Sequence, residues 1–276
     1  MFESFNLKVK PYYLLIKIRI GRIENYGFFL GILKLLMVLF FAAFSERNKS
    51  LIFIYSWFRV VDNVIDNETK APEGYTIESY IFQKKKILNG DYSTILPEDN
   101  LFLFAISLFK KYKINVSREI KDLFYAMEKE YSYRGKVISQ KEWLRNARIQ
   151  DKAAFMSVIK IVGGDCNYYE SKLSSYWGIF TKIDSLEDIE KDLKDGVINI
   201  SLEDVVKYSI PIEKIVSIGS LADFPELSRW YKEEARKALN QYKEVISIIE
   251  GRPEGFYVNM VLKLNLKLQS QPFFNG

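Results

Sequence analysis

The sequence predicts an all-α fold, and three observations lead to this prediction. Apolar residues recur along nearly the whole chain at the spacing of one helix face. Residues that begin and end helices separate these stretches, and no pair of alternating strands is joined by an Asn-Gly-type turn. The 276 residues also contain no repeat, low-complexity tract or long linker. We therefore expect a single-domain helical bundle over residues 1–276, with 1–26 as an N-terminal extension.

Capping signals set the boundaries of the expected helices. Ser139 and Ser201 each begin a capping box, and Thr76 and Ser117 mark two further helix starts. The helix ends are marked by Asn89-Gly90, Gly163-Gly164, Gly196 and Gly251. The predicted helices cover residues 47–67, 77–88, 98–113, 118–134, 140–162, 168–195, 202–208, 224–250 and 255–269.

The segment 28–44, FFLGILKLLMVLFFAAF, is apolar apart from Lys34. It is at the short limit of a membrane-spanning helix, which needs about 20 residues. It is too long for the apolar part of a signal peptide, although Ala43-Phe44-Ser45 fits a small-x-small cleavage site. We favour a helix buried beside an apolar cavity over a membrane anchor or interfacial helix, and over a cleaved signal.

The composition excludes whole classes of chemistry. The chain has no histidine, which removes Ser-His and Cys-His nucleophile pairs and every His-containing zinc site. Its single cysteine, Cys166, leaves no internal disulfide and fits a reducing compartment, so we expect a cytoplasmic protein. The net charge of +5 is no nucleic-acid-binding signature, and no nucleic acid is expected as a partner. Polar chemistry must come from carboxylates, lysine, arginine and hydroxyls, for which Mg²⁺ is a natural partner.

A first carboxylate pair lies in the segment 55–66, YSWFRVVDNVID. Asp62 and Asp66 are four residues apart, so they project about 40° apart on one helix face, and Tyr55 and Arg59 share that stripe. The remaining positions are strongly apolar. Two like charges on such a helix repel each other, and a cation between them removes the repulsion. The alternative is a pair of acids near a helix end that reaches solvent.

A second carboxylate row lies in the segment 179–196, IFTKIDSLEDIEKDLKDG. Asp184, Asp188 and Asp192 recur every four residues, with Thr181 and Lys191 close to the same stripe. A solvated acidic face is the alternative for this segment alone. Two such helices that face each other across a bundle would hold Mg²⁺ ions, which Mn²⁺ could replace. A diphosphate suits that geometry, because metal ions and arginine neutralise it as it leaves and an allylic cation forms.

The first of these blocks resembles the first aspartate helix of the squalene/phytoene synthase family, an aromatic-rich run that ends R-x-x-D-D-x-x-D. The resemblance implies an isoprenoid-synthase-type bundle with a central apolar cavity. It also implies that Arg59 contacts diphosphate and that Asp62 and Asp66 bind Mg²⁺. Asn63 replaces the second of the family's adjacent aspartates, but the ligand pair is retained.

The second block resembles the family's second signature, R-D-x-x-E-D followed by G-R-I-Y-L-P. The resemblance assigns Asp188 and Asp192 as metal ligands and places Asp184 at the family's Asn ligand position. Glu187 replaces a diphosphate-binding Arg, and Thr181 replaces Gln.

The chain departs further from the family over residues 142–155, EWLRNARIQDKAAF. Asn146 stands where the family has a tyrosine implicated in the chemistry, and Asp151-Lys152 interrupt a strip of small residues. Lys152 and Lys191 are further candidates for diphosphate contact, with Thr181 and Tyr55 as further substrate-binding candidates. The family's metal and diphosphate residues are thus better retained than those of the later rearrangement.

The resemblance implies a transferase that condenses two prenyl diphosphates head to head. Geranylgeranyl diphosphate is slightly favoured over farnesyl diphosphate, which would place the enzyme in carotenoid-type isoprenoid biosynthesis. A phytoene-like product needs no reductant, so NADPH is not expected. Because substrates and products are lipids, peripheral membrane association fits this function.

Two other functions stay open. A terpene synthase or prenyl-diphosphate lyase would use one substrate at the same metal site, and the D-x-x-x-D-x-x-x-D spacing suits it. A non-catalytic scaffold or assembly factor would have kept the fold and lost the chemistry. Glu187 and the rewritten 142–155 segment favour the scaffold, whereas the five retained aspartates count against it.

Overall fold

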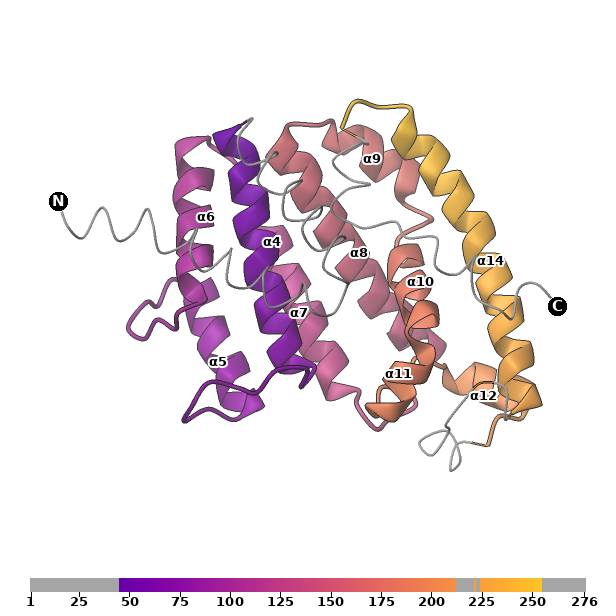
Figure 1. Cartoon of the computed structure of the whole chain (residues 1–276). Coiled ribbons are helices and arrows are strands. Elements are labelled where there is room, and N and C mark those ends of the chain that lie inside the picture. Colours follow the sequence, from indigo (N-terminus) through magenta and orange to yellow (C-terminus); the bar gives the residue numbers. More distant parts are fainter. Residues whose placement is uncertain (1–44, 212–220, 222–223, 255–276) are drawn as a thin grey trace, which may run out of the picture. The chain divides into compact units, whose positions relative to one another are not determined.

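The protein was analysed as a computed structural model that describes residues 45–211, 221 and 224–254 (Figure 1). Within these ranges it contains ten α-helices and no strand, which confirms the predicted all-α fold class. The predicted helix over 255–269, the segment 28–44 and the extension 1–26 lie outside the described residues. No described helix is long and apolar enough to cross a membrane.

The described residues divide into two compact units. One is formed by 45–117 together with 160–163, and the other by 118–159 and the described residues from 164 to 254. The predicted single domain stays a prediction, because this division does not show whether either unit folds alone.

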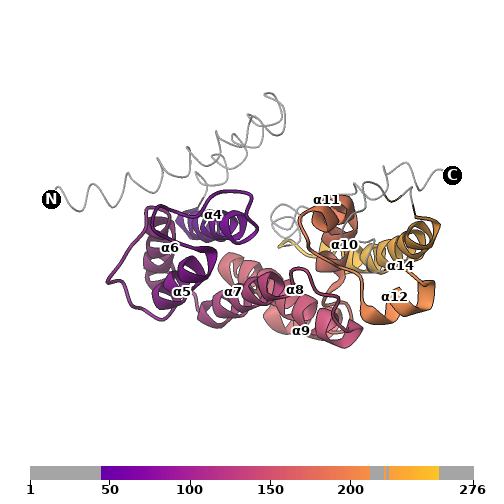
Figure 2. The same cartoon turned by 90° about the horizontal axis from the view of Figure 1, so that it is seen from below.

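The first unit contains α4 (Glu46–Ile65), α5 (Ile77–Leu88) and α6 (Asp99–Lys111), and α4 packs chiefly against α6 (Figure 2). Ser45 caps α4 by accepting a hydrogen bond from the Arg47 N–H at 3.2 Å. Thr76 and Ser79 form a reciprocal capping box at the start of α5. Helix α4 ends two residues earlier than predicted, and Asn67 follows it in the left-handed region with a φ of 59°.

A buried ionic cluster fastens the three helices of this unit together. Lys84 of α5 is 0% exposed, and its ammonium lies 2.7 Å from Glu98 and 2.7 Å from Asp99. The Trp57 indole of α4 donates to Asp99 at 3.0 Å, and the Tyr80 hydroxyl donates to Glu98 at 2.8 Å. Burial and the adjacent Glu98 raise the pKa of Tyr80. Each buried polar group here therefore has a partner, which offsets much of its desolvation cost.

The second unit contains the other described helices, apart from Ser117 of α7 and the last residues of α8. Within it, α10 packs against α14 (Figures 1 and 2). Its helices are α7 (Ser117–Ser132), α8 (Gln140–Val162), α9 (Cys166–Leu173), α10 (Ile179–Glu187), α11 (Ile189–Lys194), α12 (Leu202–Tyr208) and α14 (Pro225–Glu250). Helix α8 extends into the first unit, where Arg47 donates to the carbonyls of Lys160 (3.1 Å) and Ile161. These contacts satisfy carbonyls in the last turn of α8 that lack helical partners.

The prediction of one helix over 168–195 is wrong, because three helices occupy this stretch. Helix α9 ends at Leu173, and a turn leads to Gly178, whose φ of 104° is readily adopted only by glycine. A second interruption falls at Asp188, between α10 and α11. Apolar residues recur at helical spacing through both interruptions, so the sequence pattern did not indicate where the helices end.

Candidate functional site

The predicted α4 site residues lie along the partly exposed face of this helix. Tyr55, Arg59, Asp62 and Asp66 are all half-buried, whereas residues such as Trp57 on the other face are fully buried. The Arg59 guanidinium lies 2.9 Å from an Asp62 carboxylate oxygen, and the two side chains are 38% and 26% exposed. The structure therefore places Arg59 and Asp62 on one face of α4, with Asp66 as the C-cap residue that follows the helix.

The second carboxylate row spans the junction of α10 and α11. Asp184 and Asp188 are exposed and Asp192 is half-buried. Although Asp188 interrupts the helix, its N–H donates to the Asp184 carbonyl at 3.0 Å, and the Asp192 N–H donates to the Asp188 carbonyl at 2.8 Å. This i to i−4 bonding keeps the three residues one turn apart across the break. Lys191, a predicted diphosphate contact, lies exposed on α11.

Asp192 accepts a hydrogen bond from Asn199, a residue that no sequence pattern indicated as part of a site. The Asn199 amide donates to an Asp192 carboxylate oxygen at 2.8 Å, and its own oxygen accepts from the Trp143 indole at 3.4 Å. The chain turns at Gly196, which has a φ of 77°, and thereby brings Asn199 back toward α11. Asn199 thus fixes the orientation of one predicted metal ligand.

The first turn of α10 is capped by a carboxylate from another helix. Gly178, the N-cap residue, has no side chain, and Asp151 of α8 takes over this role. Asp151 accepts from the N–H groups of Gly178 (2.6 Å), Phe180 (2.9 Å) and Thr181 (2.9 Å), and from the Thr181 hydroxyl (2.7 Å). Burial raises the pKa of Asp151 to about 6, against the lowering effect of these hydrogen bonds. The residue that interrupts the family's small-residue strip is therefore a structural anchor.

Two of the predicted substrate-binding residues, Thr181 and Lys152, already have partners within the protein. The Thr181 hydroxyl donates to Asp151, and the Lys152 ammonium pairs with Glu170 on the exposed surface. Diphosphate contact by either side chain would have to compete with its present partner.

The carboxylates suit Mg²⁺ chemically, since they supply the oxygen ligands that this ion prefers. In the described ranges, no group of three or more Asp, Glu or Cys side chains is arranged to hold a metal ion. The α4 pair belongs to the first unit and the α10–α11 row belongs to the second. Metal binding across the two rows stays a prediction.

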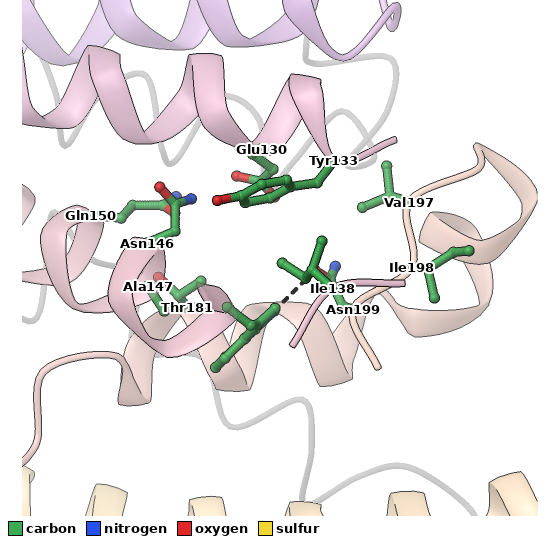
Figure 3. A pocket seen from close by; sticks show the side chains of 11 residues that line it. Glu130, Tyr133, Ile138, Asn146, Ala147, Gln150, Thr181, Val197, Ile198 and Asn199 are labelled. Carbon is green, nitrogen blue, oxygen red and sulfur yellow. Dashed lines mark hydrogen bonds between the residues drawn. The ribbon is translucent and has the colours of Figure 1, made fainter. Parts of the chain in front are cut away.

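A pocket lined by both polar and apolar side chains lies within the second unit (Figure 3). We call it the polar pocket. Its walls come from α7, the segment between α7 and α8, α8, α10 and residues 197–199. The polar side chains among them include Glu130, Tyr133, Trp143, Asn146, Gln150 and Asn199. Asn146, which replaces the family's tyrosine, is 9% exposed and donates to the Ala126 carbonyl at 3.1 Å. Through Asn199 the polar pocket adjoins Asp192 of the carboxylate row.

Comparison with known proteins places this architecture in a fold. No protein-family model matches the chain. No curated protein matches it either. The crystal structure of squalene synthase HpnC from Alicyclobacillus acidocaldarius is similar with a TM-score of 0.67 at 13% identity, over 98% of this chain and 94% of that one. A dehydrosqualene synthase in complex with ligand gives a TM-score of 0.61 at 12% identity, over 89% of this chain and 82% of that one.

These similarities show the class of the fold, which is the all-α fold of isoprenoid synthases. Within that class, the chain has the fold of squalene synthase and dehydrosqualene synthase. The fold implied by the resemblance of the two aspartate blocks to the squalene/phytoene synthase family is therefore confirmed. The low identity agrees with a divergent sequence.

Proposed function

We propose that this protein is a Mg²⁺-dependent transferase that condenses two prenyl diphosphates head to head. The observation that carries the proposal is the stripe of Arg59, Asp62 and Asp66 on one face of α4, within a fold shared with squalene synthase. A scaffold has no use for a row of adjacent carboxylates that repel each other. Geranylgeranyl diphosphate is the slightly favoured substrate over farnesyl diphosphate.

The proposed roles follow from the chemistry of each side chain. The planar guanidinium of Arg59 would bind two diphosphate oxygens at once, in exchange for its present contact with Asp62. Bound Mg²⁺ would neutralise negative charge on the departing diphosphate. Its ligands would be Asp62, Asp66, Asp184, Asp188 and Asp192. Asn199 and Asp151 would keep the second row in place.

In the proposed reaction, the carbon–oxygen bond of one substrate breaks and leaves an allylic cation. The double bond of the second substrate attacks this cation, and loss of a proton gives a cyclopropylcarbinyl diphosphate. Ionisation of that diphosphate, rearrangement and loss of a second proton would then yield a phytoene-like hydrocarbon. These steps involve no net reduction, so the proposal requires no NADPH.

A second candidate is a single-substrate terpene synthase or lyase. The carboxylate row on α10 and α11 favours it, because the three aspartates keep their one-turn spacing across the helix break. Such an enzyme would ionise one diphosphate and would not need the residues that the family uses for the second ionisation.

The test is incubation of the purified protein with Mg²⁺ and labelled geranylgeranyl or farnesyl diphosphate, with and without NADPH. Mass spectrometry of the extracted products gives the readout. A hydrocarbon or cyclopropyl diphosphate that contains two prenyl chains would support head-to-head condensation. A single-chain alcohol or cyclic product would establish the second candidate instead. A folded protein that turns over neither diphosphate would contradict both.

Substitution of the α4 carboxylates links activity to the site. The double variant Asp62→Asn, Asp66→Asn should lose Mg²⁺-dependent turnover and Mg²⁺-dependent stabilisation by a diphosphate. Glu73→Gln removes an exposed carboxylate from the same unit and serves as the matched control. Equal loss in both variants would show that general charge, and not the α4 pair, is responsible.

A further inference from the structure

The polar pocket contains two amide oxygens that are buried and lack hydrogen-bond partners in the described part of the chain. They are Oδ1 of Asn146 and Oε1 of Gln150, which stand one turn apart on α8. Figure 3 shows both side chains on the same wall of the polar pocket. Buried polar atoms in folded proteins almost always have a partner, so these two oxygens indicate an occupant.

The orientation of the Asn146 amide is fixed by its other contact. Its nitrogen donates to the Ala126 carbonyl at 3.1 Å, and a carbonyl can only accept. The oxygen must therefore point to the pocket side of the amide, where it can only accept as well. Because Asn146 is 9% exposed, bulk water does not satisfy this oxygen freely.

The remaining walls do not suit an anion. Among the described residues that line the polar pocket, Glu130 is the only charged one, and none is basic. Lys182 approaches one wall, where its ammonium lies 5.2 Å from the Trp143 ring centre, but it pairs with Glu234 at 3.1 Å. A diphosphate or carboxylate would thus meet amide oxygens and a carboxylate, with no basic side chain among the described lining residues.

We propose that the polar pocket binds the hydrogen-bond-donating head of a neutral or cationic ligand, a hydroxyl or a primary ammonium group. An ammonium group can donate to both the Asn146 and the Gln150 oxygen, whereas a hydroxyl can donate to one of them. The proposal goes beyond the anion and metal binding of the proposed function, although Thr181, a predicted substrate-binding residue, also lines this pocket. It depends on residues of one unit alone.

A series of octyl compounds that share one chain and differ in their head group tests the proposal by calorimetric titration. Octylammonium and octanol carry donors, octyltrimethylammonium carries charge without a donor, and octanoate is an anion. We expect each donor compound to bind at least about tenfold more tightly than the other two compounds. Whichever donor binds more tightly identifies the head group. Equal or tighter binding of octyltrimethylammonium or octanoate would overturn the proposal.

Two variants locate the binding. Asn146→Leu and Gln150→Leu each remove one acceptor at similar size, and each should weaken binding of the donor compounds about tenfold. Gln140→Leu is the matched control, since it changes an exposed amide at the start of the same helix. Circular dichroism checks that each variant is folded, and if Asn146→Leu is not, Gln150→Leu alone decides. Donor binding that neither folded variant weakens would refute the site.

Discussion

The buried carboxylate of Asp151 makes the stability of this protein depend on pH in a direction that can be measured. Its side chain is 4% exposed, and four donors from the first turn of α10 contact its two oxygens. Burial raises its pKa from 3.8 to about 6 in the folded protein. In the unfolded chain the carboxyl is hydrated and keeps its ordinary value.

The sign follows from proton linkage. Because the folded protein binds this proton more tightly than the unfolded chain does, the stability contributed by the protonated carboxyl is full below its ordinary pKa. It is lost as the pH rises through the folded pKa of about 6. The interval between 3.8 and about 6 corresponds to about 3 kcal/mol of unfolding free energy.

The variant Asp151→Asn cannot titrate, so it isolates this contribution. The unfolding free energy of the variant minus that of the wild type should rise by about 3 kcal/mol between about pH 3.5 and pH 7.5. This change with pH is the prediction, and the size of the difference at any single pH is not. Urea unfolding at several pH values, followed by circular dichroism, measures this change. Asp122→Asn, which removes a carboxylate that is 47% exposed in the same unit, is the control for the loss of one negative charge. A constant or falling difference for Asp151→Asn would refute the argument, because the hydrogen bonds would then outweigh burial.

Three further predictions test the anchors of the fold and of the site. Lys84→Met leaves two buried carboxylates without their cation and should cost about 3–5 kcal/mol in urea unfolding, whereas Lys110→Met on an exposed position should cost little. Arg47→Met removes the donors to the α8 end and should lower the unfolding free energy by about 1–3 kcal/mol, which thermal melts would detect. Asn199→Ala should weaken Mg²⁺ binding about tenfold in a titration with diphosphate present, and an unchanged Mg²⁺ affinity would contradict its role beside Asp192.

Local signals account for the parts of the fold that the sequence predicted well. The expected ranges 77–88, 140–162 and 202–208 agree with α5, α8 and α12. Their starts depend on serine and threonine caps that bond within three residues, such as Thr76 with Ser79. The α4 site stripe was predictable for the same reason, since its residues are neighbours on one helix.

The parts that the sequence did not predict depend on contacts between distant segments. Asp151 caps residues 27–30 positions further along the chain. In the sequence alone, Lys84 has the pattern of a solvent-exposed lysine on a helix. Only the fold brings Glu98 and Asp99 into contact with it. The helix breaks at Gly178 and Asp188 were not predicted, because apolar residues recur at helical spacing across both positions. Apolar periodicity alone does not show where one helix ends and the next begins.

The carboxylate row on α10 and α11 depends on these distant contacts for its existence. The two helices have nine and six residues, and isolated helices shorter than about 12 residues are marginal in water. Asp184, Asp188 and Asp192 add mutual repulsion to that weakness. Asp151 fixes the first turn of α10 and Asn199 fixes the last aspartate of the row, so other segments anchor the two helices that carry it. A cation shared by the aspartates would remove the repulsion that these anchors now oppose. Binding of such a cation should therefore stabilise the second unit as well as prepare it for a diphosphate.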